Sequence, residues 1–237
     1  MRIIQFLDLE GTRRVGVVQD AGIIQALAGE HTVYDLALDA IRRARSLLRV
    51  VSEQTIDRDI DYAGLIAERR VLPPLDHPDP AHMLITGTGL THLGSADARD
   101  RMHKETEPAL TDAVPEAPPM TDSMRMFRMG LEGGKPAPGE TGIQPEWFYK
   151  GDGSIVVAPS RTLIVPAFAL DGGEEPEIVG LYLIAPNGDP YRLGFALGNE
   201  FSDHVMEKQN YLYLAHSKLR PCAFGPELRL GDLPEDV

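Results

Sequence analysis

The segment 172–200 constrains the fold of this chain more than any other part of the sequence, because it contains two strand patterns joined by a strong turn signal. Residues 178–184 are apolar apart from one glycine and rich in β-branched and aromatic side chains, which predicts a buried strand. Residues 187–190, Asn-Gly-Asp-Pro, predict a turn, and residues 191–200 alternate as a second strand. We therefore expect a β-hairpin centred near Gly188.

This hairpin is expected to bring three glutamates together. Glu175 and Glu177 precede the first strand, and in an extended chain residues i and i+2 point to the same face, roughly 6.5 to 7 Å apart. Counting outward from the turn places Glu200 opposite this pair. Three carboxylates without cysteine or clustered histidine suit a hard cation, Mg²⁺, Mn²⁺ or Ca²⁺, rather than zinc. The alternative is an exposed strand end whose acids only face water, and the spacing alone does not decide between the two.

The same residues resemble the fumarylacetoacetate hydrolase superfamily, in which an E-x-E strand and a later N-D-x-S segment hold a divalent metal. The first segment corresponds here to Glu175-x-Glu177. The second corresponds to residues 199–202, Asn-Glu-Phe-Ser, with Glu200 where most members have Asp.

Two further segments follow in the order expected for this superfamily. Residues 148–150 are similar to its F-x-K segment, and residues 218–226 are similar to its K-x-x-x-x-C-P-x-G-P stretch. The resemblance extends from about residue 84 to 228. The pair Asp203 and His204 stands where the common pattern has Ala-Arg, and this region looks most like the sugar-acid branch. That branch is associated with 2-keto-3-deoxy sugar acids.

The resemblance implies an activity and a set of site residues. A divalent cation would chelate the carboxylate and 2-keto oxygen of a small acid, which makes the C3 hydrogen acidic, so that a pentonate-type 2-keto-3-deoxy sugar acid loses water. C–C hydrolysis of an acylpyruvate or a 2,4-diketo sugar acid is one alternative, and an inactive metal-binding protein is another. The implied residues are Glu175, Glu177 and Glu200 for Mg²⁺ (or Mn²⁺ or Ca²⁺), Asn199 and Ser202 for substrate, and His92, Lys150 and Lys218 for catalysis.

Residues 87–95 contain the family's catalytic loop in altered form. His92 matches the histidine of the G-x-N-Y-x-x-H-x-x-E pattern, but Ser95 stands where the glutamate belongs. This departure favours dehydration over C–C hydrolysis. A loop histidine that only faces solvent is the alternative for His92. The spacing of Gly87 and Gly89 satisfies neither the P-loop nor the dinucleotide-binding pattern, which argues against nucleotide binding.

The chain divides by pattern into two predicted domains, of the α+β class but mostly β. Residues 1–75 predict a small β/α domain: three strands, at 2–7, 13–19 and 22–27, and then a helix over 34–52. A proline-rich hinge leads into residues 76–237, for which short strands, including 155–158 and 162–166, predict a rolled, barrel-like sheet. Within it, residues 91–122 form a predicted lid, because their Pro-rich acidic part has little apolar surface to order it.

Composition limits the partners of the chain. A formal charge of −13, from 23 basic and 36 acidic residues, argues against nucleic acid and anionic membrane. A single cysteine, Cys222, and the absence of a signal-peptide pattern or a long apolar run predict a cytoplasmic protein. The resemblance implies a homodimer. It also implies further strands after Val237, so we expect the C-terminal part of the barrel to be missing.

Overall fold

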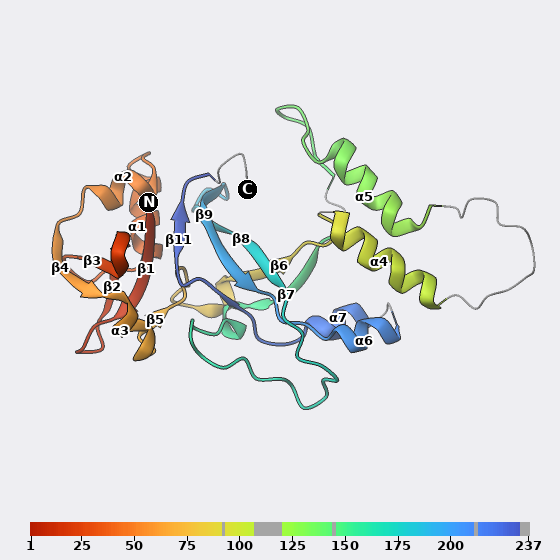
Figure 1. The fold of residues 1–237 in the computed structure, drawn as a ribbon. Coiled ribbons are helices and arrows are strands. Elements are labelled where there is room, and N and C mark those ends of the chain that lie inside the picture. Colours follow the sequence, from red (N-terminus) through yellow and green to blue (C-terminus); the bar gives the residue numbers. More distant parts are fainter. Residues whose placement is uncertain (92, 107–119, 144–145, 211–212, 233–237) are drawn as a thin grey trace, which may run out of the picture. The chain divides into compact units, whose positions relative to one another are not determined.

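By its contacts the chain divides into two units: unit 1 combines Met1–Leu84 with Gly151–Val237, and unit 2 is Ile85–Lys150. The predicted domains, 1–75 and 76–237, both contribute strands to the main sheet of unit 1, and the boundary between them remains a prediction. The computed structural model describes residues 1–91, 93–106, 120–143, 146–210 and 213–232 (Figure 1).

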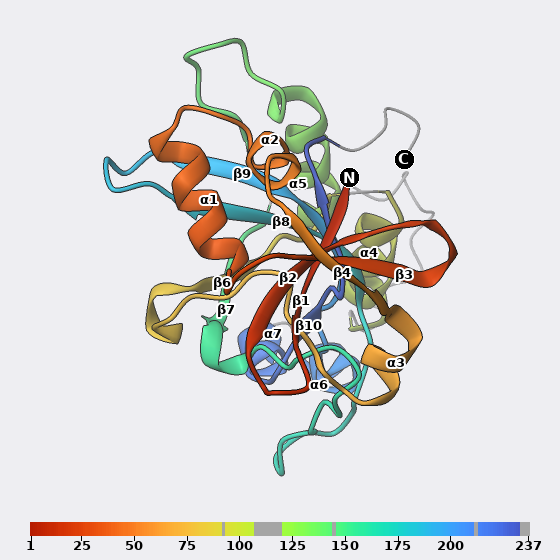
Figure 2. The same ribbon diagram turned by 90° about the vertical axis from the view of Figure 1, so that its left-hand side faces the viewer.

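One strongly curled antiparallel sheet organises unit 1 (Figures 1 and 2). Its strand order is β10-β9-β11-β1-β2-β3-β4, with β5 paired to β1 and β8 paired to β9. The predicted class, α+β with a rolled sheet, is confirmed. The strands are β1 (Arg2–Leu7), β2 (Arg13–Val18), β3 (Ile23–Leu27), β4 (Ile56–Asp61), β5 (Val71–Leu72), β8 (Pro176–Ile184), β9 (Pro190–Asn199), β10 (Ala223–Phe224) and β11 (Leu228–Leu230).

The two ends of the chain meet in this sheet. In the pairing of β1 with β11, Arg2 lies opposite Arg229 and Ile3 opposite Leu228. Strand β11 also pairs with β9, so the N-terminal meander and the β8–β9 hairpin belong to one continuous sheet. The three predicted N-terminal strands are confirmed, within one residue at their ends.

The predicted single helix over 34–52 is wrong, because the chain forms two helices there, α1 (Val33–Arg42) and α2 (Leu47–Ser52). Ala44 between them has φ +50°, in the left-handed region that ends a helix. The Ser46 hydroxyl then accepts a hydrogen bond from the Arg49 amide and starts the second helix.

The main core lies between helices α1 and α2 and the curled sheet, and it fixes the register of the hairpin. Leu181 and Leu183 of β8 are buried in it, whereas Tyr182 between them is 54% exposed. A slip of one residue would exchange these two faces, so the burial pattern specifies the register strongly. From β9 the hairpin adds Leu193 and Ala196 to this core, and residues from the rest of unit 1 complete it: Ile3, Val15, Leu27, Val33, Leu36, Val50, Phe224 and Leu228.

The rest of unit 1 consists of short helices, α3 (Tyr62–Ala67), α6 (His204–Gln209) and α7 (Leu214–Lys218), and of irregular chain. The strands predicted at 155–158 and 162–166 are wrong. A 3₁₀ turn covers Gly153–Ile155, Val156 forms one isolated bridge with Cys222, and residues 157–172 contain no strand. Pro159 and Pro166 cannot donate to a strand ladder, which accounts for this difference.

Unit 2 contains two longer helices, α4 (Leu93–Thr106) and α5 (Asp122–Gly133), and most of the strands β6 (Leu84–Gly87) and β7 (Phe148–Asp152), which pair with each other. The Thr121 hydroxyl caps α5 and also donates to Asp100 of α4 at 2.5 Å. Of the predicted lid, residue 92 and residues 107–119 lie outside the described residues, so this assignment remains a prediction. No helix in the described ranges has both the length and the apolar character that a membrane span requires.

Candidate metal centre

The candidate site lies at the open end of the β8–β9 hairpin, and the predicted register of this hairpin is confirmed. Ile184 pairs with Pro190 next to the turn, and Pro176 pairs with Asn199 at the far end. One step further, the Glu200 amide donates to the Glu175 carbonyl at 3.0 Å. Glu200 therefore lies directly opposite Glu175, whereas the count from the turn predicted a position opposite the pair of Glu175 and Glu177.

Three carboxylates converge at this end. One carboxylate oxygen each from Glu175, Glu177 and Glu200 lies within 4.8 Å of the other two. Oxygens bound to one Mg²⁺ at about 2.1 Å are at most about 4.2 Å apart, so small side-chain movements would bring all three into range. The oxygen-only donor set matches the preference of Mg²⁺, Mn²⁺ and Ca²⁺. These residues fit a divalent cation, as the sequence predicted.

A buried lysine lies among these acids. The Lys218 ammonium is 2.8 Å from Glu200 Oε1, 3.1 Å from Glu175 Oε2 and 3.3 Å from Glu207 Oε1, and its side chain is only 8% exposed. Burial by itself would lower the pKa of Lys218, but the carboxylates of Glu200, Glu175 and Glu207 outweigh it and raise the pKa to about 12. Lys218 is therefore suited to act as a fixed positive charge rather than as a base near neutral pH.

The residues predicted to bind substrate hold the site together. Ser202 is fully buried; its hydroxyl donates to Glu200 Oε1 at 2.9 Å and accepts from the Lys218 ammonium at 2.9 Å. The Asn199 side-chain oxygen accepts from the Glu175 amide at 3.1 Å and from the Phe201 amide at 3.0 Å. Phe201 has φ +58°, so Asn199 stabilises a tight turn that directs Glu200 and Ser202 inward. Their role in substrate binding remains a prediction.

A buried ion pair clamps this turn to its neighbours. Asp203 and Arg220 are fully buried as side chains and 3.1 Å apart. Arg220 also donates to the carbonyls of Asp171 and Ser202, at 2.8 and 2.9 Å. Asp203 accepts from the amides of Leu170 and Asp171, and at 2.8 Å from the amide of Met206, which caps α6. Burial raises the pKa of Asp203, but these amides and the Arg220 guanidinium reverse the effect and lower it.

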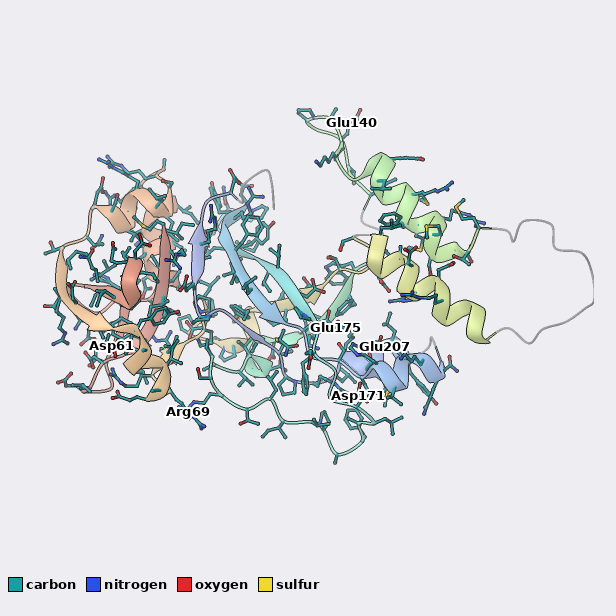
Figure 3. The ribbon with its side chains drawn as sticks, in the orientation of Figure 1. Asp61, Arg69, Glu140, Asp171, Glu175 and Glu207 are labelled. Carbon is teal, nitrogen blue, oxygen red and sulfur yellow. The ribbon has the colours of Figure 1, made fainter. Side chains whose placement is uncertain are left out.

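His204 is a neighbour of the triad to which the sequence assigned no role. Its Nε2 is 3.0 Å from Glu175 Oε1, and its Nδ1 is 3.9 Å from Asp171 Oδ2. The imidazole lies so close to the backbone that a Cβ on Gly173 would be 2.5 Å from Nδ1, so a side chain at position 173 would displace the imidazole. Figure 3 shows Asp171, Glu175 and Glu207 gathered where β8 begins, beside α6 and α7.

Glu207 and Arg220 also had no predicted role. Aspartate is a residue type that caps helices, so the position of Glu207 one turn after Asp203 was the available signal for it. Arg220 carries no comparable signal, because its contacts depend on segments that are remote in sequence.

Two of the predicted catalytic residues belong to unit 2 of the chain. Lys150 lies in β7, within unit 2, and its side chain is buried. His92 lies outside the described residues. The catalytic roles of Lys150 and His92 remain predictions.

Four further expectations from the sequence also remain predictions. They are the homodimer, the cytoplasmic location, the exclusion of nucleic-acid and membrane partners, and the expected absence of strands after Val237.

Comparison with known proteins identifies the fold. No protein-family model and no curated protein matches the chain. The structure of 2-keto-3-deoxy-D-arabinonate dehydratase complexed with magnesium and 2,5-dioxopentanoate aligns with a TM-score of 0.59 at 19% identity, over 98% of this chain and 66% of that chain. A hexagonal crystal form of 2-keto-3-deoxyarabinonate dehydratase gives 0.58 at 18% identity, over 98% and 68%.

At these identities the likeness establishes the fold, which this chain shares with the two dehydratase structures. The predicted resemblance is thus confirmed at the level of the fold. The chain spans about two thirds of the length of these dehydratases.

Proposed function

We propose that this chain is a divalent-cation-dependent enzyme that removes water from a pentonate-type 2-keto-3-deoxy sugar acid. The observation that carries the proposal is the convergence of Glu175, Glu177 and Glu200 at the open end of the β8–β9 hairpin. The shared fold supports it, because one protein with this fold is a dehydratase solved with magnesium and a dioxo acid.

The charges of the centre suit this chemistry. The carboxylates of Glu175, Glu200 and Glu207 surround the Lys218 ammonium, and Glu177 completes the triad beside them. A 2-keto acid is itself an anion, and it is repelled by such a group unless further positive charge is present. A bound divalent cation would supply that charge and Lewis acidity toward the carboxylate and 2-keto oxygen of the acid.

The chain's own residues contribute positioning and fixed charge. Lys218 keeps its proton near neutral pH and places a positive charge beside the centre, where it stabilises negative charge that develops on the acid. Ser202 and Asn199 hold Glu200 in place, and the turn that carries them is held by the buried Arg220. The C3 hydrogen leaves as a proton and the C4 hydroxyl follows, which together release one water. His92 and Lys150 are proposed to serve proton transfer and charge stabilisation in this step.

The test is a paired substrate assay with reconstituted protein. The chain is stripped with EDTA, reloaded with Mg²⁺ or Mn²⁺, and incubated with the stereoisomers of 2-keto-3-deoxypentonate and, separately, with an acylpyruvate. Cation-dependent loss of one water, followed by proton NMR, is expected with one pentonate stereoisomer. The Glu177→Gln variant should lose this turnover, whereas Glu174→Gln, which removes an exposed acid beside the triad, should retain it.

Cleavage of the acylpyruvate without dehydration would assign the chain to C–C hydrolysis instead. Failure to bind Mn²⁺ would remove the basis of both reactions and leave a protein without metal chemistry.

A further inference from the structure

Glu207 lies beside the candidate metal centre but outside the predicted ligand set. It comes from α6, its side chain is only 9% exposed, and its Oε1 is 3.3 Å from the Lys218 ammonium. The hydroxyl of the fully buried Ser217 in α7 donates to the same oxygen at 2.5 Å. Burying a carboxylate without such partners costs free energy, so the contacts with Ser217 and Lys218 are what stabilise Glu207 in this buried position.

The Lys218 ammonium is shared between two sets of oxygens. On one side are two triad carboxylates, Glu200 at 2.8 Å and Glu175 at 3.1 Å. On the other side are Glu207 at 3.3 Å and the Ser202 hydroxyl at 2.9 Å. In the structure the ammonium is nearer to the triad carboxylates than to Glu207. It therefore contacts two of the carboxylates that a divalent cation would also use.

We propose that Glu207 is a positioning residue that receives the Lys218 ammonium when a divalent cation takes up the Glu175 and Glu200 oxygens. The inference rests on the proposed metal site. Lys218 then competes with the cation for the triad, and Glu207 weakens this competition by offering the ammonium a second carboxylate within reach. Without Glu207 the ammonium would lose the carboxylate on this side, and a cation would have to displace it from Glu175 and Glu200 at greater cost.

The proposal predicts opposite effects of two substitutions on metal affinity. Glu207→Gln keeps the shape of the side chain and removes its charge, and it should weaken Mn²⁺ binding about tenfold, the lower end of effects of outer residues on metal affinity. Lys218→Met removes the competing ammonium and should tighten Mn²⁺ binding by a factor on the order of ten. In the Lys218→Met background, Glu207→Gln should change the affinity by less than about twofold, because the residue through which it acts is gone.

The experiment is a double-mutant cycle on Mn²⁺ affinity in the full chain, followed by the electron paramagnetic resonance signal of free Mn²⁺. Glu174→Gln serves as the matched control, because it removes one acid beside the triad from an exposed position. Ser217→Ala is a second route to the same effect, since it removes the hydroxyl that holds Glu207, and it should weaken binding in the same direction. Thermal unfolding of each variant without metal shows whether the variant is folded.

An equal loss from Glu207→Gln in both backgrounds would overturn the proposal and make Glu207 a direct contributor to the cation's electrostatic environment. Equal effects of Glu207→Gln and Glu174→Gln would overturn it as well, because a general charge effect would then suffice. If the unsubstituted chain does not bind Mn²⁺, the proposed function fails, which is a different outcome from either of these.

Discussion

The buried pair of Asp203 and Arg220 allows the sharpest prediction about stability. Replacing Arg220 by Met keeps most of the volume of the side chain and removes its charge and its donors. Asp203 would then remain fully buried without its cationic partner, and the carbonyls of Asp171 and Ser202 would lose the guanidinium that bridges them.

The expected cost follows from these contacts. Removing one partner of a buried ion pair typically costs 3–5 kcal/mol. Asp203 keeps its hydrogen bonds from the amides of Leu170 and Met206, which favours the lower end of this range. We therefore expect Arg220→Met to lower the free energy of unfolding by about 3 kcal/mol. For a chain of this size, that corresponds to a fall in Tm of roughly 6–12 °C.

The pH dependence gives a second signature. Because the folded-state pKa of Asp203 is lowered, its contribution to stability is present above the ordinary aspartate pKa of about 4 and is lost as pH falls through the folded-state value. Loss of Arg220 raises the pKa of Asp203 in the variant. The stability deficit of Arg220→Met should thus be largest above about pH 5 and should shrink below pH 4, where protonation neutralises the carboxylate.

Urea unfolding at pH 7, 5 and 3.5 measures both effects. Arg192→Met is the matched control, because Arg192 pairs with Asp232 at an exposed position, with 44% and 80% of the two side chains accessible. Exposed pairs contribute about 0 to 1 kcal/mol, so this variant should unfold almost like the original chain. A deficit below about 1 kcal/mol for Arg220→Met, or one that grows at low pH, would refute the reasoning.

Three further predictions concern the metal centre. Glu177→Gln should weaken Mn²⁺ binding at least about tenfold in calorimetric titration, and Glu174→Gln should change it by less than about twofold; similar losses at both positions would contradict the triad. Asn199→Ala should lower the free energy of unfolding by about 1–3 kcal/mol, because the amides of Glu175 and Phe201 lose their acceptor. It should also lower the affinity for Mn²⁺. A change in only one of these two quantities would show that the turn at Asn199 does not position the metal-binding carboxylates. The raised pKa of Lys218 implies a contribution to stability that is fully present below its unfolded pKa of about 10.5 and is lost as pH rises through about 12. The stability difference between the original chain and Lys218→Met should therefore stay constant between pH 7 and 9. A drift of this difference across that range would indicate a lower pKa of Lys218.

The hairpin was predictable because its determinants are local. The turn at residues 187–190 sets the register, and the alternation of Leu181, Tyr182 and Leu183 sets the face that is buried. Those two facts place Glu200 near Glu175 and Glu177, whereas the irregularity in the pairing between Leu181 and Tyr182, which shifts the register by one residue, was not predicted.

The parts that were not predictable depend on partners far away in the chain. The pairing of Ile3 with Leu228 joins segments that are more than two hundred residues apart, and no local sequence pattern predicts this pairing. Ala44 ends a helix although alanine is a good helix former, because the capping Ser46 and the burial of Leu47 favour a restart. A lone arginine such as Arg220 is expected at the protein surface, but its side chain is fully buried in the structure, where it forms an ion pair with Asp203.

The same distinction explains why the acids can be neighbours at all. Like charges repel, so a hairpin end with Glu175, Glu177 and Glu200 would separate if only the local chain held it. Contacts with the rest of unit 1 hold the end of the hairpin in place. Leu181 and Leu183 are buried in the core of this unit, and Arg220 donates a hydrogen bond to the Ser202 carbonyl in the turn after β9. The stability of the core and the Lys218 ammonium beside Glu175 and Glu200 together offset the repulsion, and a bound divalent cation would offset it further. A site that conflicts with local electrostatics but is enforced by the rest of the fold is where function is expected.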